Sequence, residues 1–314
     1  MPALLTPRAA CDALAALGVD VAPEDVRLQG RGRGWIAWLP GDRIAWFAGS
    51  DEARAALARE RRVLGVVATR CRPDVVPVPS VVAAAPDGAC DVRTAMLGAC
   101  DPLWLYARVR DDPHAAARFG ASAGALLAEL HAAVPAADVA GWLPGRPEWP
   151  EPLAWAEERL PGVVDDPGLH ARCYEVLARY EAVGTPDAER VLAHGDFGFH
   201  NLTVDPESLA VRGVFDWEAA CWGDPCHDFR YLVCNGDCPR LLDAALAAYE
   251  RRTGRAPSRG RIALENAACA VTYLAFRAGV PPDERWCSRT LAEDLAWTRR
   301  AVARVLDRPG RDDV

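Results

Sequence analysis

The stretch LAHGDFGFHNLTVDPESLAVRGVFDWE, from Leu192 to Glu218, decides the fold of this chain. It contains short apolar runs typical of strands, and the sequence DPES at residues 205–208 is a turn signal between the last two runs. If residues 202–204 and 211–215 pair as antiparallel strands, Asn201 begins one strand and Asp216 ends the other. The hairpin would then bring these two side chains next to each other.

The polar residues of this stretch suit one kind of chemistry. An amide oxygen from Asn201 and a carboxylate from Asp216 are hard oxygen ligands of the kind that hold Mg²⁺ together with nucleotide phosphates, and Glu218 adds charge nearby. Asp196 lies in a His-Gly-Asp turn five residues before Asn201, where it could accept a proton from a hydroxyl group. A base beside a metal site is what phosphoryl transfer requires. An accidental acidic loop is the alternative.

Three motifs in order, HGDFGFHN, FDWE and GDPCHDF, resemble the aminoglycoside phosphotransferase family, the small-molecule branch of the protein-kinase-like fold. The resemblance implies an α+β, two-lobed fold with a small antiparallel-sheet N-lobe that carries one main helix, and a larger, mainly helical C-lobe. It also implies Mg²⁺ as cofactor and ATP or GTP as phosphate donor.

The resemblance assigns a role to each matching position. Asp196 would be the catalytic base, and Asn201 and Asp216 would bind Mg²⁺. Supporting roles fall to residues that shape the catalytic loop or add charge beside the metal: His194, Glu218, Asp224 and Asp228. Glu60 would be the helix acid that pairs with a nucleotide-binding cation.

The first part of the chain fits the smaller lobe. Residues 26–48 alternate around a Pro-Gly-Asp turn and predict a hairpin, with GRGRG at residues 30–34 at its start. Gly32 and Gly34 could let backbone N–H groups approach phosphate oxygens, although a glycine-rich turn alone is a weak signal. Ser50 caps a predicted helix, and residues 75–98 supply two more strands. We therefore expect an N-lobe over residues 1–98 and a C-lobe over residues 99–314.

The chain contains no lysine, so all 36 basic residues are arginine. Kinase-like sites use a lysine on the third strand, and the family register places Trp46 at that position. Arg43 lies three residues earlier, on the opposite face of the strand, and is the predicted nucleotide-binding cation, with Arg31 and Arg33 as alternatives. If none of them supplies the charge, the chain is instead a regulatory pseudokinase.

Composition limits the other possibilities. A chain of 314 residues that is 51% hydrophobic can bury a large core, and a formal charge of -8 argues against a nucleic-acid partner. The amino terminus predicts an amphipathic helix from Thr6-Pro7 rather than a signal peptide, and no apolar run is long enough for a membrane span, so we expect a cytoplasmic protein. The eleven cysteines then predict reduced, buried thiols. The alternative is a zinc site formed by His227 and four cysteines: Cys221, Cys226, Cys234 and Cys238.

The acceptor is predicted from the resemblance alone to be a small hydroxylated antibiotic, with a metabolite as the alternative. Acids of the helical lobe could attract a cationic antibiotic, although they could equally form a solvated face: Glu157, Glu158, Asp165 and Asp166. The tryptophans outside the motifs are interpreted as packing residues rather than as a substrate cage: Trp142, Trp149, Trp155 and Trp286.

Overall fold

The structure, a computed structural model, describes residues 5–32, 34–236, 238–285 and 289–307. Its first part is a five-stranded antiparallel sheet in the order β1-β2-β3-β5-β4. The strands are β1 (Arg27–Arg31), β2 (Gly34–Leu39), β3 (Arg43–Ala48), β4 (Val81–Ala84) and β5 (Cys90–Thr94). The hairpin predicted over residues 26–48 is therefore incomplete as an interpretation, because its first residues form a third strand, β1.

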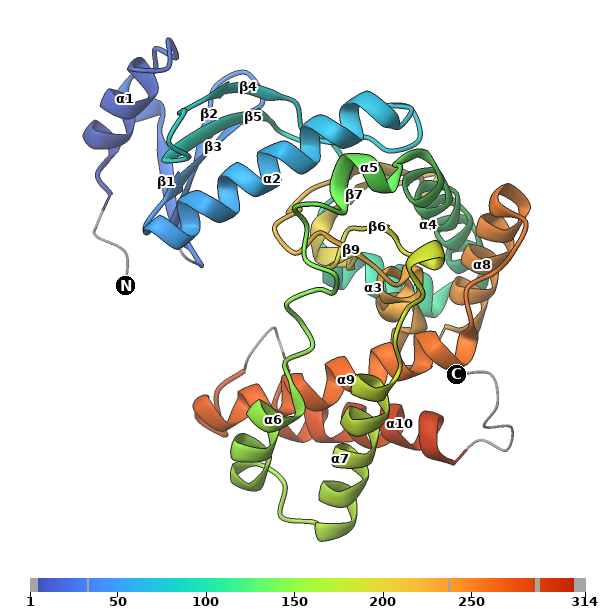
Figure 1. The fold of residues 1–314 in the computed structure, drawn as a ribbon. Helices are drawn as coiled ribbons and strands as arrows, with labels where there is room; N and C mark the ends of the chain where they lie inside the picture. The colour runs from blue at the N-terminus through green and yellow to red at the C-terminus, as the bar shows by residue number, and fades with distance from the viewer. Residues whose placement is uncertain (1–4, 33, 237, 286–288, 308–314) are drawn as a thin grey trace.

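Two helices pack on opposite faces of this sheet (Figure 1). Helix α1 (Pro7–Ala15) begins where the sequence predicts and is capped by Thr6. Its apolar side chains share one core with those of the sheet: Ala10, Leu14, Ala37, Ala45 and Val92. Helix α2 (Asp51–Arg70) begins after Ser50, whose hydroxyl accepts a hydrogen bond from the N–H of Ala53. Its apolar face joins the sheet to the rest of the molecule through Val63 and Leu64, which belong to the core of the second part.

The second part is mainly helical, as the sequence predicts. Its helices are α3 (Pro102–Asp111), α4 (Pro113–Ala133), α5 (Ala136–Val139), α6 (Leu153–Arg159), α7 (Pro167–Ala182), α8 (Pro239–Thr253), α9 (Arg259–Phe276) and α10 (Leu291–Leu306). Helices α4 and α8 lie side by side around the core that contains Leu126 and Trp217. Helices α6, α7, α9 and α10 enclose a separate apolar core at the far end of the molecule (Figure 1).

Two small sheets lie between these helices and the five-stranded sheet. Strand β6 (Val191–Ala193) pairs with β9 (Cys221–Gly223), and β7 (Leu202–Val204) pairs with β8 (Val211–Val214), both antiparallel. Leu202 lies opposite Val214, and the N–H of Phe215 donates to the carbonyl of Asn201 at 3.1 Å. The predicted hairpin is therefore confirmed, and it brings Asn201 close to Asp216.

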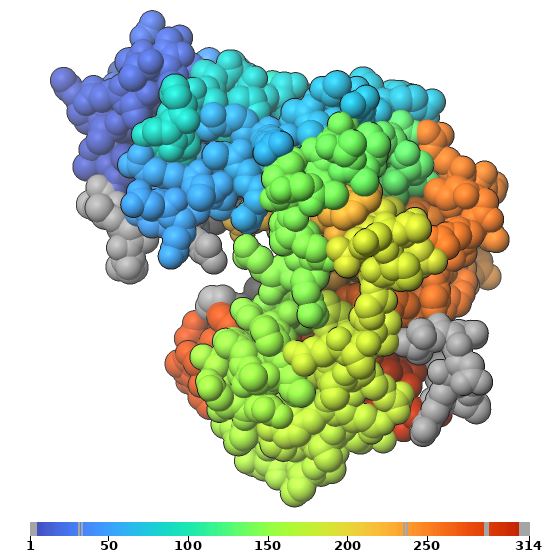
Figure 2. Space-filling model, viewed as in Figure 1, coloured from blue at the N-terminus to red at the C-terminus, as the bar shows by residue number. Residues whose placement is uncertain are grey.

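The two parts leave a hollow between them. Figure 2 shows the surface hollowed between α2 and the helices α6 and α10, beside the segment that connects α5 to α6. No helix within the described residues combines the length and the apolar character needed to cross a bilayer.

Candidate active site

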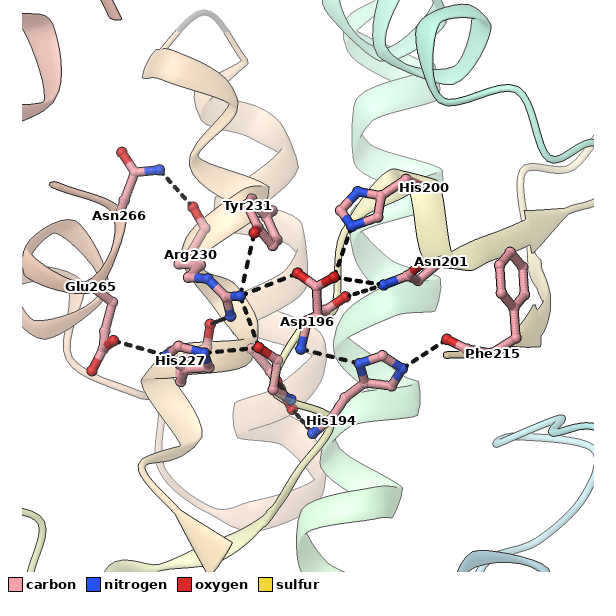
Figure 3. A network of polar contacts seen from close by, with 12 residues as sticks. His194, Asp196, His200, Asn201, Phe215, His227, Arg230, Tyr231, Glu265 and Asn266 are labelled. Atoms are coloured by element: carbon pink, nitrogen blue, oxygen red, sulfur yellow. Dashed lines mark hydrogen bonds and ion pairs between the residues drawn. The ribbon is translucent and has the colours of Figure 1, made fainter. Parts of the chain in front are cut away.

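Asp196 lies at the centre of a polar network between β6 and the short helix η4 (Phe199–Asn201) (Figure 3). Its Oδ2 is 2.9 Å from Nε2 of His200 and accepts a hydrogen bond from Nδ2 of Asn201 at 2.8 Å, while Nη2 of Arg230 is 3.3 Å from Oδ1. Burial raises the pKa of Asp196, but the hydrogen bond and charge of His200 and the charge of Arg230 outweigh it and hold the pKa well below the ordinary value. The carboxylate is therefore charged at neutral pH.

Asp228, in the 3₁₀ segment η5 (Pro225–Gly236), fixes the backbone just before Asp196. Its two oxygens accept hydrogen bonds from the N–H groups of His194 at 2.8 Å and Gly195 at 2.9 Å, and Nε2 of His131 is 3.2 Å from Oδ2. Burial raises the pKa of Asp228, but the hydrogen bond and charge of His131 and the other nearby histidines lower it to about 2. Asp228 thus lies where the resemblance implies a bracing residue. His131, interpreted from sequence only as a packing residue, contacts it.

Asp224 reaches the catalytic loop through other side chains. Its Oδ2 is 3.0 Å from Nε of Arg261, and Arg261 pairs with Glu265 at 3.2 Å. Glu265 lies 2.9 Å from one ring nitrogen of His227, whose other ring nitrogen is 2.9 Å from the carbonyl oxygen of Gly195 (Figure 3). His227 is therefore held within this network by both ring nitrogens.

Asn201 and Asp216 present oxygens that fit a magnesium ion. Because the amide nitrogen of Asn201 donates to both the carbonyl and the carboxylate of Asp196, its Oδ1 is left buried without a hydrogen-bond partner. A buried oxygen with no partner is costly unless an ion or water occupies the neighbouring space. Asp216 adopts a left-handed backbone conformation with φ 65, at the point where the chain leaves β8. The donor set is thus the hard-oxygen type that Mg²⁺ prefers.

His194 connects Asp196 to residues 215–218, the metal segment, which contains the predicted Mg²⁺ ligand Asp216. Its Nδ1 is 3.2 Å from the N–H of Asp196, and its Nε2 is 3.1 Å from the carbonyl oxygen of Phe215, directly before Asp216. Burial lowers the pKa of His194, which favours the neutral ring that one accepting and one donating nitrogen require. These contacts hold His194 between the backbones of Asp196 and Phe215, and its shaping role stays a prediction.

Gly34 and Glu60 line the same small cavity as the metal segment, whereas Arg43 is not part of its lining. A small cavity of about 70 Å³ is lined by Gly34, Trp46, Glu60, Asp216 and Glu218, among others. A side chain at Gly34 would place its Cβ 2.2 Å from the carbonyl oxygen of Phe47, so only glycine fits this strand. Gly32 forms the turn between β1 and β2 with φ 53.

The prediction for Arg43 is wrong. Arg43 pairs with Thr94 on the sheet face that carries Ala45 and Val92, and its Nε donates to the carbonyl of Pro40 at 2.9 Å. The carboxylate of Glu60 instead pairs with Arg93 of β5, which sequence reasoning missed, at 2.8 Å. The alternatives to Arg43 are Arg31 and Arg33. Arg33 lies outside the described residues, and so does the side chain of Arg31.

A second cavity of about 590 Å³ opens beside the catalytic loop at Gly198, Phe199 and His200. Aromatic side chains dominate its walls: Tyr106, Trp149, Phe199, Tyr231, Tyr273 and Trp297. Trp149 is interpreted from the sequence as a packing residue, and this interpretation is incomplete because its side chain also lines the cavity. Trp286 lies outside the described residues. Among the described residues of the lining, Asp101 and Arg289 carry opposite charges, and Arg289 pairs with Asp294 at 2.6 Å.

The acids proposed to attract a cation lie elsewhere. Asp166 caps α7 and pairs with Arg299 at 2.8 Å, and Glu158 is 3.3 Å from Arg159. The described lining of the aromatic cavity includes none of the four acids: Glu157, Glu158, Asp165 and Asp166.

The four cysteines of the alternative zinc site are all buried: Cys221, Cys226, Cys234 and Cys238. Over the residues that the structure describes, no group of three or more His, Cys, Asp or Glu side chains could hold a metal ion. The contacts of His227 with Glu265 and Gly195 occupy both of its nitrogens.

Comparison with known proteins agrees with this geometry. The model of the phosphotransferase enzyme family matches residues 35–263. The structure of the GDP complex of wild-type aminoglycoside 2'-phosphotransferase-IIIa is 18% identical with a TM-score of 0.67, and the match covers 93% of this chain and 96% of that chain. No curated protein matches the chain.

Other solved structures share the fold. The apoenzyme of macrolide 2'-phosphotransferase MphH from Brachybacterium faecium is 21% identical with a TM-score of 0.62, and the match covers 96% of this chain and 99% of that chain. A choline/ethanolamine kinase family protein from Mesorhizobium loti is 20% identical with a TM-score of 0.56, with 96% of each chain covered. These similarities confirm the predicted two-lobed α+β fold.

Proposed function

We propose that this chain, which belongs to the phosphotransferase enzyme family, transfers the γ-phosphate of ATP or GTP to a hydroxyl group of an antibiotic that carries little charge. The observation that supports the reaction most directly is the pairing of Asp196 with Asn201. The amide nitrogen of Asn201 donates to the carboxylate of Asp196, and the amide oxygen of Asn201 is buried and unpaired. The loop that carries both residues borders the aromatic cavity. GDP, named in the aminoglycoside relative's structure, supports a nucleoside triphosphate as donor.

In the proposed reaction, Asp196 accepts the proton of the acceptor hydroxyl while the hydroxyl oxygen forms a bond to the γ-phosphorus. The bond from the γ-phosphorus to the β–γ bridging oxygen breaks, and ADP or GDP leaves. Arg230 and Asn201 hold the carboxylate in one orientation, and Asp228 holds the backbone that carries it. His200 contacts Asp196 and also lines the aromatic cavity, so this is the side on which the proposal places the acceptor. Asn201 and Asp216 would hold Mg²⁺, which supplies charge neutralisation at the phosphates when it is bound.

The chemistry of the cavity supports the choice of acceptor. Its aromatic walls favour a large apolar surface, and the described lining residues carry one charge of each sign, at Asp101 and Arg289, rather than a cluster of acids. Of the acceptor types named for the similar structures, aminoglycoside, macrolide and choline or ethanolamine, a macrolide-like compound fits this lining best. The size of about 590 Å³ also suits a drug-sized ligand better than a small amino alcohol.

A transfer assay tests the proposal. The wild-type protein is incubated with Mg²⁺, labelled ATP or GTP and a panel of macrolides, aminoglycosides, nucleoside antibiotics and choline-type metabolites. We expect kcat/KM for at least one weakly charged, apolar antibiotic to exceed that for every aminoglycoside by about tenfold or more. A preference for a choline-type metabolite would instead support a metabolite kinase, and nucleotide binding without transfer to any acceptor would support a pseudokinase.

The proposed biological role follows from the reaction. Phosphorylation of an antibiotic in the cytoplasm, where nucleoside triphosphates are available, would protect the cell from it. Expression of the protein in a susceptible bacterium should then raise the inhibitory concentration of the same compound that the transfer assay selects. Unchanged inhibitory concentrations despite measurable transfer in vitro would argue against a role in resistance.

A further inference from the structure

Glu60 of α2 connects the five-stranded sheet to the metal segment. Its Oε2 pairs with Nη1 of Arg93 at 2.8 Å, and its Oε1 accepts a hydrogen bond from the N–H of Trp217 at 2.9 Å. Trp217 directly follows Asp216, one of the two proposed magnesium ligands. We infer that Arg93, on β5, is the positioning residue that replaces the strand-3 lysine. It fixes the position of Asp216 through the contacts of Glu60 with Arg93 and with the backbone of Trp217. This inference rests on the proposed function.

The strand register explains how an arginine from another strand takes this place. Ile44 lies opposite Arg93 and Trp46 lies opposite Asp91, and partners in a sheet project from the same face. Arg93 and Trp46 therefore both project toward α2, from neighbouring strands, and the guanidinium carbon of Arg93 is 5.8 Å from the Trp46 ring centroid. Arg43, with the opposite alternation, faces the core shared with α1.

The neighbouring charges suit an arginine at this position. Arg93 also pairs with Asp91 at 3.0 Å, and Asp91 pairs with Arg61 at 2.7 Å, so two cations and two carboxylates alternate. The side chains of Glu60, Asp91 and Arg93 are 6%, 0% and 3% exposed. A guanidinium can donate to two carboxylates in fixed directions, which a compact ammonium does less well. Removal of Arg93 would leave the buried carboxylate of Glu60 without this counter-ion.

Arg93 acts at a distance from the nucleotide. Trp46, Glu60 and Asp216 line the small cavity beside the metal segment, whereas Arg93 is 2% exposed. Its effect on metal and nucleotide binding must therefore pass through the position of Glu60 and the Trp217 backbone. A displacement of about 1 Å at a positioning group can lower a rate by about a hundredfold.

A charge-exchange experiment tests the inference. Arg93→Met removes the cation, and the double variant Arg93→Met/Trp46→Lys returns one to the same sheet face on β3. Two quantities are measured: the Mg²⁺ concentration for half-maximal binding of a non-hydrolysable ATP or GTP analogue, by calorimetry, and kcat/KM with the best acceptor.

For Arg93→Met, we expect kcat/KM to fall about a hundredfold and the half-maximal Mg²⁺ concentration to rise about tenfold. The double variant should regain about tenfold in both quantities, because the lysine introduced on β3 would pair with Glu60 again. Arg43→Met is the matched control, and it should stay within about twofold of wild type because the Arg43 side chain donates to the carbonyl of Pro40 on the opposite face of the sheet from Arg93.

Thermal melting of each variant separates positioning from folding. If Arg93→Met does not fold, Arg93→Lys replaces it, with an expected loss of about tenfold because lysine keeps the charge without the two-carboxylate geometry. Wild-type Mg²⁺ dependence in a folded Arg93 variant, or a folded double variant that is no better than Arg93→Met, overturns the inference. If the wild-type protein binds nucleotide but transfers phosphate to no acceptor, the proposed function fails and the binding measurements still decide the role of Arg93.

Discussion

At the scale of the residue, Asp196 carries the proposed chemistry, and its replacement is the most direct test. Asp196→Asn keeps the size of the side chain but removes the charge that accepts the proton, so we expect kcat to fall about a thousandfold. Nucleotide affinity should change by less than about threefold, because Asn201 and Asp216, rather than Asp196, are proposed to face the metal. Rapid-quench measurement of phosphate transfer and calorimetry of nucleotide binding give the two quantities.

Asp205→Asn provides the matched control for that experiment. Asp205 lies in the turn between β7 and β8, where it accepts hydrogen bonds from Ser208 and contacts Arg212, so the same chemical change occurs outside the site. The control should retain kcat within about twofold. If Asp196→Asn keeps more than about a tenth of the wild-type kcat, another group accepts the proton.

At the scale of the element, the sequence predicts contacts within a segment better than contacts between segments. Asn201 and Asp216 could be placed together because one hairpin and its turn, residues 205–208, determine their separation. Arg93 could not be identified, because β5 pairs with β3 only after α2 intervenes, and its register is set by packing rather than by local sequence. The strand β1 was missed for a related reason, since the glycine turn before β2 conceals a strand boundary.

Asp228 makes the link between η5 and the catalytic loop sensitive to acid. Its pKa of about 2 in the folded protein lies below the ordinary value of 3.8, so the stabilisation is complete above about pH 4 and is lost as pH falls toward 2. The shift corresponds to stabilisation on the order of 2 kcal/mol. Asp228→Asn removes this titrating group while keeping one oxygen for the N–H groups of His194 and Gly195.

The expected result is a difference in unfolding free energy between wild type and Asp228→Asn that is largest above about pH 4. The difference should shrink as pH falls from about 5 to 2, because protonation of Asp228 removes the charge that His131 stabilises. Urea unfolding at several pH values measures it. A difference that does not change with pH would show that Asp228 is not charged in the folded protein, and the bracing account would need revision.

At the scale of the whole molecule, the site lies where the sheet-bearing part meets the helices, and no single segment contains it. Residue 99 illustrates the junction, because Ala99 forms an isolated antiparallel bridge with Val204 of β7. The division at residues 98 and 99 stays a prediction that this bridge does not test. The aromatic cavity combines residues from α3, η5, α9 and α10, so its composition could not be derived from any one motif.

Trp149 tests whether this assembled cavity is the acceptor site. Trp149→Ala removes a large aromatic surface from the cavity wall, so KM for the acceptor should rise about tenfold while KM for the nucleotide stays unchanged. Trp142→Ala is the matched control, since Trp142 packs under Arg62 and donates to the carbonyl of Asp138 at 2.7 Å, outside the cavity. Steady-state kinetics with each substrate varied in turn separate the two KM values. An equal rise in the acceptor KM of both variants would indicate a general loss of stability. An unchanged acceptor KM in Trp149→Ala would mean that the acceptor binds elsewhere along the catalytic loop. The aromatic lining would then no longer support an apolar acceptor.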